Sequence, residues 1–291
     1  MALNLRAMIK LLRPHQWLKN GFVFVGLMFG HAWHDAATVQ AVVVAALGFC
    51  LISSAIYIVN DLADREADRL HPHKRLRPLA AGSVSPSQGV VLSVLCALAG
   101  LLLAWSASLQ VLLIVAGYGV LNLLYSWRLK HMVILDVFVI ATGFMLRILA
   151  GTVGVGIPPS SWLLLTGLMV TLFLGFSKRR AELVVMEHSD APARKVLQNY
   201  SRPMLEVMIG VCATGVVLAY SLYTISDDVV AVHHTTNLIY TVPLVLYGLF
   251  RYLYLSFSSD AGEDPAHDLL RDSHLLLTVL GWAALTFWLL A

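Results

Sequence analysis

Three aspartates in the stretch NDLADREAD, residues 60–68, are the residues of this chain best suited to carry chemistry. Asp61, Asp64 and Asp68 are spaced i, i+3 and i+7, so a continuous helix would place all three on one face. Carboxylates on one face repel one another unless a cation lies between them. Mg²⁺ prefers oxygen ligands and commonly takes one or two carboxylates together with phosphate oxygens. With Asn60 as a neighbouring ligand, the stretch predicts a magnesium site that binds a diphosphate.

A basic run follows the last of these aspartates, and it suits the same ligand. The run consists of Lys74, Arg75 and Arg77. Both residue types bind phosphate oxygens through charge-assisted hydrogen bonds. The alternative is a solvated helix of mixed charge beside a membrane, which does not explain why the acids share one face. We therefore expect this run to contact the anionic part of a substrate.

The rest of the chain is strongly apolar. Of its 291 residues, 58% are hydrophobic and 13% are charged, and the mean hydropathy is +0.76. A soluble domain of this size does not need so much apolar surface, whereas helices in lipid satisfy their own backbone hydrogen bonds. The three cysteines lie in apolar segments without metal-ligand spacing, so we interpret them as packing residues. The composition predicts an all-α integral membrane protein.

Nine apolar segments approach the length needed to cross a bilayer, which is about 20 helical residues. Their approximate limits are 20–34, 38–60, 86–106, 109–126, 133–155, 160–177, 204–224, 236–257 and 273–290. The first of them is the shortest. This pattern predicts a polytopic bundle of nine transmembrane helices that forms a single domain over residues 1–291.

The basic residues predict the orientation of this bundle. Every one of the 20 Lys and Arg residues except Arg147 falls in the N-terminal arm or in alternate connections between spans. Because positive residues are retained on the cytoplasmic side of a membrane, we expect a cytoplasmic N-terminus. The cytoplasmic connections at about 61–85, 127–132 and 178–203 are then the expected active-site loops.

Two charged residues fall inside the segment 133–155. A charge within a span is costly and commonly faces a cavity or a partner. Arg147 is therefore expected either to bind a phosphate or to pair with an acid on another span. Asp136 is expected to accept hydrogen bonds from a ribose or to orient Lys130, or else to be an acid favoured at a helix N-terminus. The two lie about 16 Å apart along a helix, too far to pair directly.

Polar residues also recur along the segment 109–126. Tyr118, Asn122 and Tyr125 are spaced i, i+4 and i+7, so they form a polar stripe on an otherwise apolar helix. The stripe ends close to Lys130. It is expected to face a substrate, or alternatively to provide aromatic packing between helices.

The aspartate motif resembles the first aspartate motif of the UbiA superfamily of intramembrane prenyltransferases. The pattern N-D-x-x-D-x-x-x-D lies at the inner end of the second span, and nine spans with a cytoplasmic N-terminus also match that family. The resemblance covers essentially the whole chain. It implies a UbiA-like bundle in which Asn60 and the three aspartates bind Mg²⁺ and a diphosphate. It also implies that Tyr125 and Lys130 lie close to that diphosphate.

The chain departs from the family's second motif, D-x-x-x-D, which follows the sixth span. The corresponding stretch is SKRRAEL, in which Lys178, Arg179, Arg180 and Glu182 replace the second pair of aspartates. Such a cationic cluster would contact phosphate directly rather than through a metal. This departure resembles the polyprenyl-phosphate phosphoribosyltransferase branch of the superfamily. Other stretches that resemble the branch are RPHQWLKN (13–20), YSWRLKHMVILDV (125–137), GFMLRILAG (143–151) and EDPAHDLLRD (263–272).

That branch implies transfer of 5-phosphoribose from phosphoribosyl diphosphate to a polyprenyl phosphate of the decaprenyl type. Diphosphate is released, Mg²⁺ is the cofactor, and the lipid phosphate attacks C1 with inversion. The resemblance also implies a bacterial plasma (inner) membrane protein that supplies a lipid-linked pentose for cell-wall arabinan. We further expect Lys19, Asn20 and Tyr200 to contact substrate. Nucleic acid is not an expected partner.

Two other functions are compatible with the sequence. A prenyltransferase that moves a prenyl group from its diphosphate to an aromatic acceptor would share the fold and the first motif, but it would need the missing aspartate pair. A transporter or ion pathway would use Asp61 and Arg147 as relay charges. Against a transporter, the charges gather at one surface, with little polar continuity toward the other side.

Overall fold

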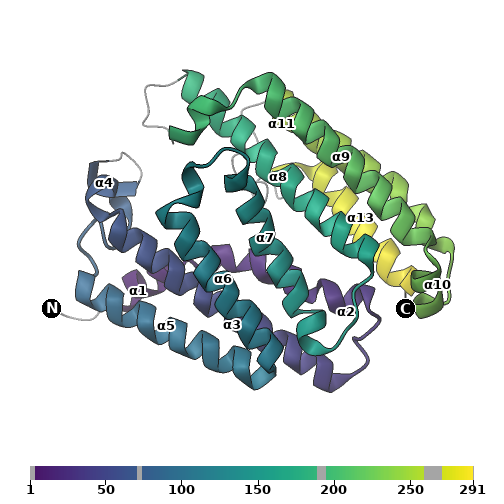
Figure 1. The fold of residues 1–291 in the computed structure, drawn as a ribbon, viewed down its shortest axis with the longest axis horizontal. Coiled ribbons are helices and arrows are strands. Elements are labelled where there is room, and N and C mark those ends of the chain that lie inside the picture. Colours follow the sequence, from purple (N-terminus) through teal and green to yellow (C-terminus); the bar gives the residue numbers. More distant parts are fainter. Residues whose placement is uncertain (1–3, 71–73, 189–194, 259–270, 291) are drawn as a thin grey trace. The chain divides into compact units, whose positions relative to one another are not determined.

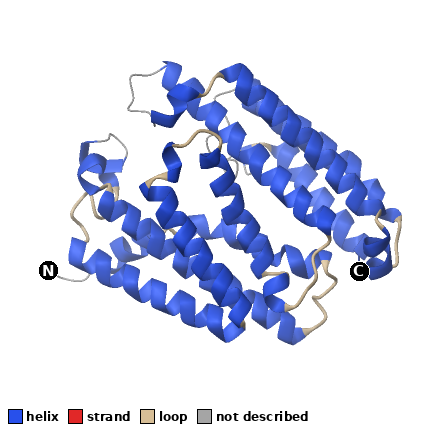
Figure 2. Ribbon diagram, viewed as in Figure 1, coloured by secondary structure: helices blue, strands red, loops and turns tan. Residues whose placement is uncertain are grey.

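The computed structural model describes residues 4–70, 74–188, 195–258 and 271–290, and all regular structure in these ranges is helical (Figure 2). The chain forms two compact units. Unit 1 comprises Met1–Trp127 and Leu146–Pro158, and unit 2 comprises Arg128–Met145 and Pro159–Ala291. Most of the stretch EDPAHDLLRD lies outside the described residues.

Unit 1 is built around one long helix, α3, which packs against α1, α5 and α6 (Figure 1). Its apolar core gathers on α3, and it includes Val42, Phe49 and Ile56. The elements of unit 1 are α1 (Leu5–Leu12), the 3-10 helix η1 (Pro14–Phe24), α2 (Val25–Phe29), α3 (Ala36–Ala63), α4 (Arg65–Leu70), η2 (Lys74–Leu76), α5 (Pro86–Ala107), α6 (Leu109–Trp127), the last part of α7 (Leu135–Ala150) and η4 (Val153–Val155).

Unit 2 contains a pair of long helices, α8 and α9, and a second pair, α11 and α13, which is joined to the first through contacts of α11 with α9. Phe173, Leu205 and Tyr252 belong to its apolar core. The elements of unit 2 are η3 (Leu129–His131), the first part of α7, α8 (Ser161–His188), η5 (Lys195–Asn199), α9 (Arg202–Ile225), α10 (Asp227–His233), η6 (Asn237–Thr241), α11 (Val242–Ser258) and α13 (Ser273–Leu290).

Local sequence signals account for where the two main helices of unit 1 begin. The Asp35 side chain accepts hydrogen bonds from the backbone N–H groups of Ala37 and Thr38, and so caps α3. Ser85 caps α5, and the side chain of Gln88 bonds back to the Ser85 N–H in a capping box. These contacts satisfy backbone donors that a helix start would leave unpaired.

Helix α8 extends further than the apolar pattern predicts. The predicted span ends at residue 177, whereas α8 continues to His188. The stretch 178–188 is therefore helical rather than a loop, and its place at the active site stays a prediction. Arg179 pairs with Glu182 one turn along the helix, which favours helical structure in this charged region.

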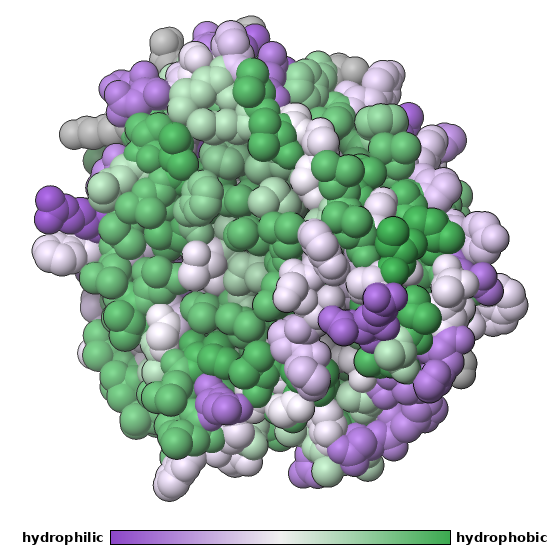
Figure 3. All heavy atoms as spheres, turned by 45° about the vertical axis from the view of Figure 1, so that its right-hand side comes forward, coloured by the Kyte–Doolittle hydropathy of each residue, from purple (hydrophilic) through white to green (hydrophobic). Residues whose placement is uncertain are grey.

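Eight helical segments of the described chain are long and apolar enough to cross a membrane. They are Ala36–Ala63, Pro86–Ala107, Leu109–Trp127, Leu135–Val155, Ser161–Glu187, Arg202–Ile225, Asn237–Phe257 and Ser273–Leu290. Large apolar side chains such as Leu102 and Trp105 are exposed on them, and Figure 3 shows apolar residues over much of the visible surface. Burial in lipid is the environment that such a surface requires, so the chain is an integral membrane protein.

The predicted count of nine spans is not confirmed, because the first apolar segment, 20–34, is not one long helix. Its helical part consists of the end of η1 and the five-residue α2, which ends at Phe29 and is capped by Gly30. A Cβ on Gly26 would lie 2.0 Å from the carbonyl oxygen of Gly151, so the backbone of α2 touches the turn that follows α7. This close backbone packing positions the segment. The cytoplasmic location of the N-terminus stays a prediction.

Helices α3 and α5 approach each other closely at a pair of glycines. A Cβ on Gly48 would lie 3.1 Å from the Gly100 carbonyl oxygen, and a Cβ on Gly100 would lie 3.0 Å from the Gly48 carbonyl oxygen. Small residues at such crossings let two membrane helices pack backbone to backbone. This crossing holds α5 against the helix that carries the aspartate motif.

Gly100→Leu should therefore destabilise the protein, because the added side chain meets backbone that cannot move aside. We expect a loss of about 1–3 kcal/mol in the free energy of unfolding. Gly117→Leu on α6 is the matched control, since a Cβ there has no atom within 4 Å. Thermal unfolding in detergent measures both variants, and equal midpoints for the two would contradict this packing.

Candidate functional site

The aspartates of the sequence motif lie at the junction of α3 and α4, where the helix is interrupted. Asp64 is the C-terminal cap of α3, with φ −90° and ψ 4°, and α4 begins at the next residue. Asp61 and Asp68 are buried, with 2% and 3% of their surface exposed, whereas Asp64 is exposed. The expectation that all three share one helical face therefore fails for Asp64, because the turn directs it toward solvent. Its role as a metal ligand stays a prediction.

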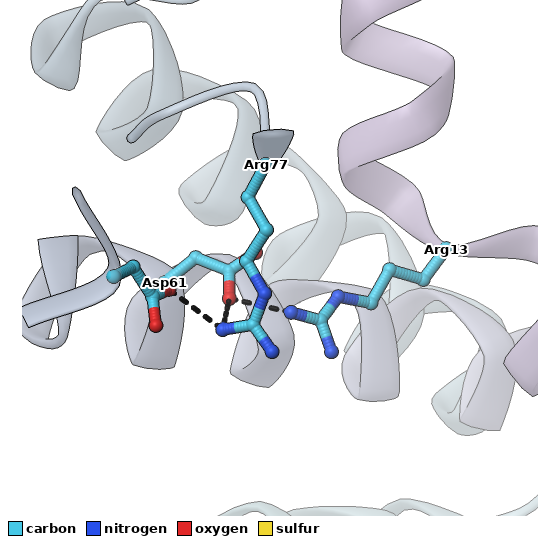
Figure 4. A network of polar contacts seen from close by, with 4 residues as sticks. Arg13, Asp61 and Arg77 are labelled. Carbon is cyan, nitrogen blue, oxygen red and sulfur yellow. Dashed lines mark hydrogen bonds and ion pairs between the residues drawn. The ribbon is translucent and has the colours of Figure 1, made fainter. Parts of the chain in front are cut away.

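Asp61 and Asp68 share one guanidinium group, that of Arg77. Figure 4 shows Asp61 between Arg77 and Arg13. Arg77 Nη1 lies 3.1 Å from Asp61 Oδ1 and 2.7 Å from Asp68 Oδ2. Arg13 Nη2 contacts the same Asp61 oxygen at 2.5 Å. Two buried carboxylates this close to each other need a cation between them. Two arginines, each from a different segment of unit 1, supply that charge.

Arg13 is a member of this cluster that the sequence interpretation did not include among the site residues. It lies between α1 and η1 in the left-handed conformation, with φ 53°, and its backbone N–H bonds to the Lys10 carbonyl oxygen. Its guanidinium lies 5.1 Å from the centre of the Tyr57 ring. The signal in the sequence is Pro14, because the residue before a proline commonly ends a helix. That signal locates the turn but not the partner of Arg13.

The loop that carries Arg77 is held against α4 by two further arginines. Arg65 Nε donates to the Leu79 carbonyl oxygen, and Arg69 Nε donates to the Ala80 carbonyl oxygen, both at 3.3 Å. These side chains satisfy backbone groups of the loop that helices cannot satisfy. Arg65 and Arg69 therefore fix the position from which Arg77 reaches the two acids.

The donor set of this cluster suits Mg²⁺ bound together with phosphates. Asp61 and Asp68 present two carboxylates around a single cationic atom, Arg77 Nη1. Mg²⁺ is commonly held by one or two protein carboxylates when phosphate oxygens and water complete its coordination. Within the described ranges, no group of three or more His, Cys, Asp or Glu is arranged to hold a metal. A metal at this cluster would therefore depend on oxygen ligands from a substrate.

A second polar cluster of unit 1 surrounds Arg147, which is only 4% exposed. Its Nε donates to Asn20 Oδ1 at 2.7 Å, and its Nη2 donates to the Tyr118 hydroxyl at 2.9 Å. The guanidinium also lies over the Tyr118 ring, 4.5 Å from its centre, and 5.5 Å from that of Phe49. Neutral oxygens and aromatic faces thus stabilise this buried charge. Phosphate binding by Arg147 stays a prediction.

Unit 2 contains a buried ionic cluster at the start of α7. Asp136 is fully buried; its Oδ2 accepts from Arg179 Nε and its Oδ1 accepts from the Tyr200 hydroxyl, both at 2.7 Å. Arg179, which is 1% exposed, also pairs with Glu182. Burial raises the pKa of Tyr200, and the hydrogen bond to Asp136 raises it further, so Tyr200 donates as a neutral phenol. The cluster joins α7, α8 and the residue that follows η5.

The three cations of the SKRRAEL stretch have different surroundings. Arg179 contacts Asp136 and Glu182, as described above. Arg180 Nε lies 3.0 Å from Glu206 Oε1, and Arg180 Nη1 donates to the Ser256 carbonyl oxygen at 2.8 Å. Lys178 is half-buried. Two of the three cations therefore bind internal partners of unit 2, and direct contact with phosphate stays a prediction for each of them.

The other predicted site residues lie on several elements. In unit 1, Lys74 and Arg75 are exposed, whereas Lys19, Asn60 and Tyr125 are half-buried. In unit 2, Lys130 lies half-buried in η3. Their substrate contacts stay predictions.

One residue of the predicted polar stripe, Asn122, forms a hydrogen bond with the backbone of α6 itself. Asn122 Nδ2 donates to the Tyr118 carbonyl oxygen at 2.9 Å. Tyr118 also lies 5.3 Å from Phe49, with the two rings edge to face. Both the contact with Arg147 and the aromatic packing between helices are therefore present at Tyr118.

Comparison with known proteins places this chain in one family. The model of the UbiA prenyltransferase family matches residues 21–269. A decaprenyl-phosphate phosphoribosyltransferase from Mycolicibacterium smegmatis is 35% identical over 285 residues, covering 94% of this chain and 89% of that protein. The protein of the same name from Mycobacterium tuberculosis is 34% identical, covering 95% of this chain and 91% of that protein.

Solved structures show the same fold at lower identity. A UbiA homologue from Archaeoglobus fulgidus bound to GPP and Mg²⁺ has a TM-score of 0.71 with 19% identity, covering 97% of both chains. A structure of digeranylgeranylglyceryl phosphate synthase has a TM-score of 0.69 with 16% identity, covering 98% of this chain and 99% of that one.

The buried position of Asp136 leads to a stability prediction. Asp136→Asn should cost about 3 kcal/mol or more, because it leaves the buried Arg179 without the charge of its fully buried partner. Glu66→Gln is the control, since Glu66 forms an exposed pair with Arg69 and should cost less than about 1 kcal/mol. Unfolding midpoints in detergent provide the comparison. A loss no larger in Asp136→Asn than in the control would contradict the assigned pairing.

Proposed function

Because this chain belongs to the UbiA prenyltransferase family, we propose that it transfers 5-phosphoribose from phosphoribosyl diphosphate to a polyprenyl phosphate of the decaprenyl type. Relatives named decaprenyl-phosphate phosphoribosyltransferase align over nearly the whole of both chains, which supports this reaction rather than prenyl transfer. The observation within the molecule that carries the proposal is the pair Asp61 and Asp68, two buried carboxylates that meet at one cation. A metal-bound diphosphate is the ligand that suits them.

Donor binding follows from an exchange of partners in the acidic cluster. Asp61 and Asp68 would hold Mg²⁺, which when bound would neutralise charge on the leaving diphosphate. Arg13 and Arg77 would then leave the carboxylates and donate hydrogen bonds to phosphate oxygens. All four charged side chains keep a partner of opposite sign, so the exchange avoids leaving any of them buried and unpaired.

The transfer itself needs little acid–base chemistry. The bond between ribose C1 and the diphosphate oxygen breaks, and C1 acquires oxocarbenium character. An oxygen of the lipid phosphate attacks from the opposite face and inverts the configuration. This phosphate is already ionised near neutral pH, so no strong general base is needed. The arginines stabilise the negative charge that develops on the departing diphosphate.

Further substrate contacts are assigned by resemblance. We assign Lys130 and Lys178 to phosphate groups of the substrates, because lysine is a common phosphate ligand. The lipid acceptor reaches the protein from the bilayer, and the soluble donor reaches it from the cytoplasm of a bacterial cell. This arrangement requires the aspartate motif to lie at the inner surface of the plasma membrane, as the distribution of basic residues also indicates.

Asp61→Asn and Asp68→Asn should each lower kcat on the order of 10²-fold to 10³-fold, because each removes a charge that holds the leaving group. The assay incubates purified protein, labelled phosphoribosyl diphosphate, decaprenyl phosphate and Mg²⁺, and follows label into the organic phase. Glu66→Gln changes an exposed acid of the same region and should retain activity. Full activity in Asp61→Asn would contradict the proposal, and so would transfer from a prenyl diphosphate in place of the sugar donor.

Arg77→Gln should have two opposite effects. Mn²⁺, used as a spectroscopic substitute for Mg²⁺, should bind the substrate-free protein more tightly, because the guanidinium no longer competes for Asp61 and Asp68. The KM for the sugar donor should rise, because a phosphate ligand is lost. Electron paramagnetic resonance measures Mn²⁺ binding, with Arg6→Gln, which changes an exposed arginine of α1, as the control. Weaker Mn²⁺ binding in Arg77→Gln would show that the two cations do not compete for one site.

A further inference from the structure

Ile134 has a strained backbone conformation directly before α7. Its φ of 67° lies in the left-handed region, which β-branched residues rarely adopt. Such strain persists where surrounding contacts hold the residue in place, and it is often found near functional sites. Ile134 as a whole residue is 36% exposed, so apolar packing alone does not enforce this conformation.

The Tyr200 hydroxyl provides a specific hold on Ile134. The backbone N–H of Ile134 donates to this hydroxyl oxygen at 2.6 Å. The hydroxyl in turn donates to Asp136 Oδ1 at 2.7 Å, and the other oxygen of Asp136 accepts from Arg179. The hydroxyl therefore donates its one proton to Asp136 and accepts a hydrogen bond from Ile134, so both interactions are made within the protein. The raised pKa of Tyr200 means that this proton is retained across the physiological range.

This network lies next to the turn that carries Lys130. Lys130 is in η3, four residues before Ile134, and η3 packs against η5, which ends one residue before Tyr200. The Tyr200 hydroxyl thus links the far end of this turn to the buried carboxylate of Asp136. The conformation of Ile134 determines the direction in which the chain leaves the turn and enters α7.

We propose that Tyr200 is a positioning residue whose hydroxyl holds Ile134 in the left-handed conformation and so fixes the turn that presents Lys130. This revises the expectation that Tyr200 itself contacts substrate. The link to catalysis rests on the proposed function, in which Lys130 binds a substrate phosphate. The link to the conformation of the turn does not depend on that function.

Tyr200→Phe tests the proposal, because it keeps the ring and removes only the hydroxyl. The turn contains two trypsin sites, Arg128 and Lys130. Limited proteolysis in detergent, with fragments identified by mass spectrometry, should show cleavage at these sites about 10-fold faster in Tyr200→Phe, the change expected when one buried hydrogen bond that holds the turn is lost. Tyr240→Phe, which changes an exposed tyrosine, should leave cleavage unchanged.

A second substitution distinguishes the effect of Tyr200 on the Ile134 backbone from a general loss of packing around Tyr200. Asparagine tolerates the left-handed conformation far better than isoleucine does. Ile134→Asn in the Tyr200→Phe background should therefore restore resistance to trypsin, because the turn no longer needs the hydroxyl. Wild-type cleavage rates in Tyr200→Phe, or failure of Ile134→Asn to restore resistance, would overturn the proposal.

Kinetics test the connection to Lys130. In the transfer assay, Tyr200→Phe should raise the KM for phosphoribosyl diphosphate several-fold more than it lowers kcat, and Ile134→Asn should reverse this change. Unchanged kinetics in a variant with faster cleavage would overturn the link to Lys130. If the wild-type protein transfers no label, the proposed function fails, while the proteolysis result still decides the role of Tyr200.

Discussion

The constraint on which unit 1 depends is that two carboxylates removed from water must share positive charge. Asp61 and Asp68 are almost fully buried, and Arg77 contacts both, while Arg13 contacts Asp61. Neither arginine lies on α3 or α4, so the turn after α1 and the loop before α5 must fold against the junction before the acids are stable there. The same cluster suits a ligand that combines a metal with phosphates, because each buried charge can exchange its partner for another of the same sign.

The other buried charges are stabilised in different ways. The difference distinguishes ion pairs that hold the helices together from the cluster proposed to bind substrate. In unit 2, Asp136 of α7 pairs with Arg179 of α8, and both side chains are almost completely buried, which suits a structural role. In unit 1, Arg147 is surrounded by the oxygens of Asn20 and Tyr118 and by aromatic rings. The acidic cluster differs from both, because its arginines are partly exposed and come from loops, where a change of partner requires little rearrangement of helices.

The cationic stretch SKRRAEL, residues 177–183, contributes to the packing of helices in unit 2. Arg179 joins α8 to the start of α7, and Arg180 joins it to α9 and α11 through Glu206 and the Ser256 carbonyl. The Arg180 guanidinium also lies 3.9 Å from the centre of the Phe257 ring. Arg179 and Arg180 therefore help to hold the helices of unit 2 together.

The sequence by itself determined the helical membrane architecture, because apolar segments of bilayer length must satisfy their backbone internally. The predicted segments 38–60, 86–106 and 273–290 agree with α3, α5 and α13 within a few residues. From charge and spacing it also predicted that Asp61 and Asp68 lie on the same side of the chain, and in the structure both contact Arg77. Only the tertiary structure decided that α2 is short, that Arg13 joins the acidic cluster and that Arg179 turns inward. Each of these depends on a contact with a distant segment, such as the backbone of Gly151 or the carboxylate of Asp136, and local patterns carry no information about such partners.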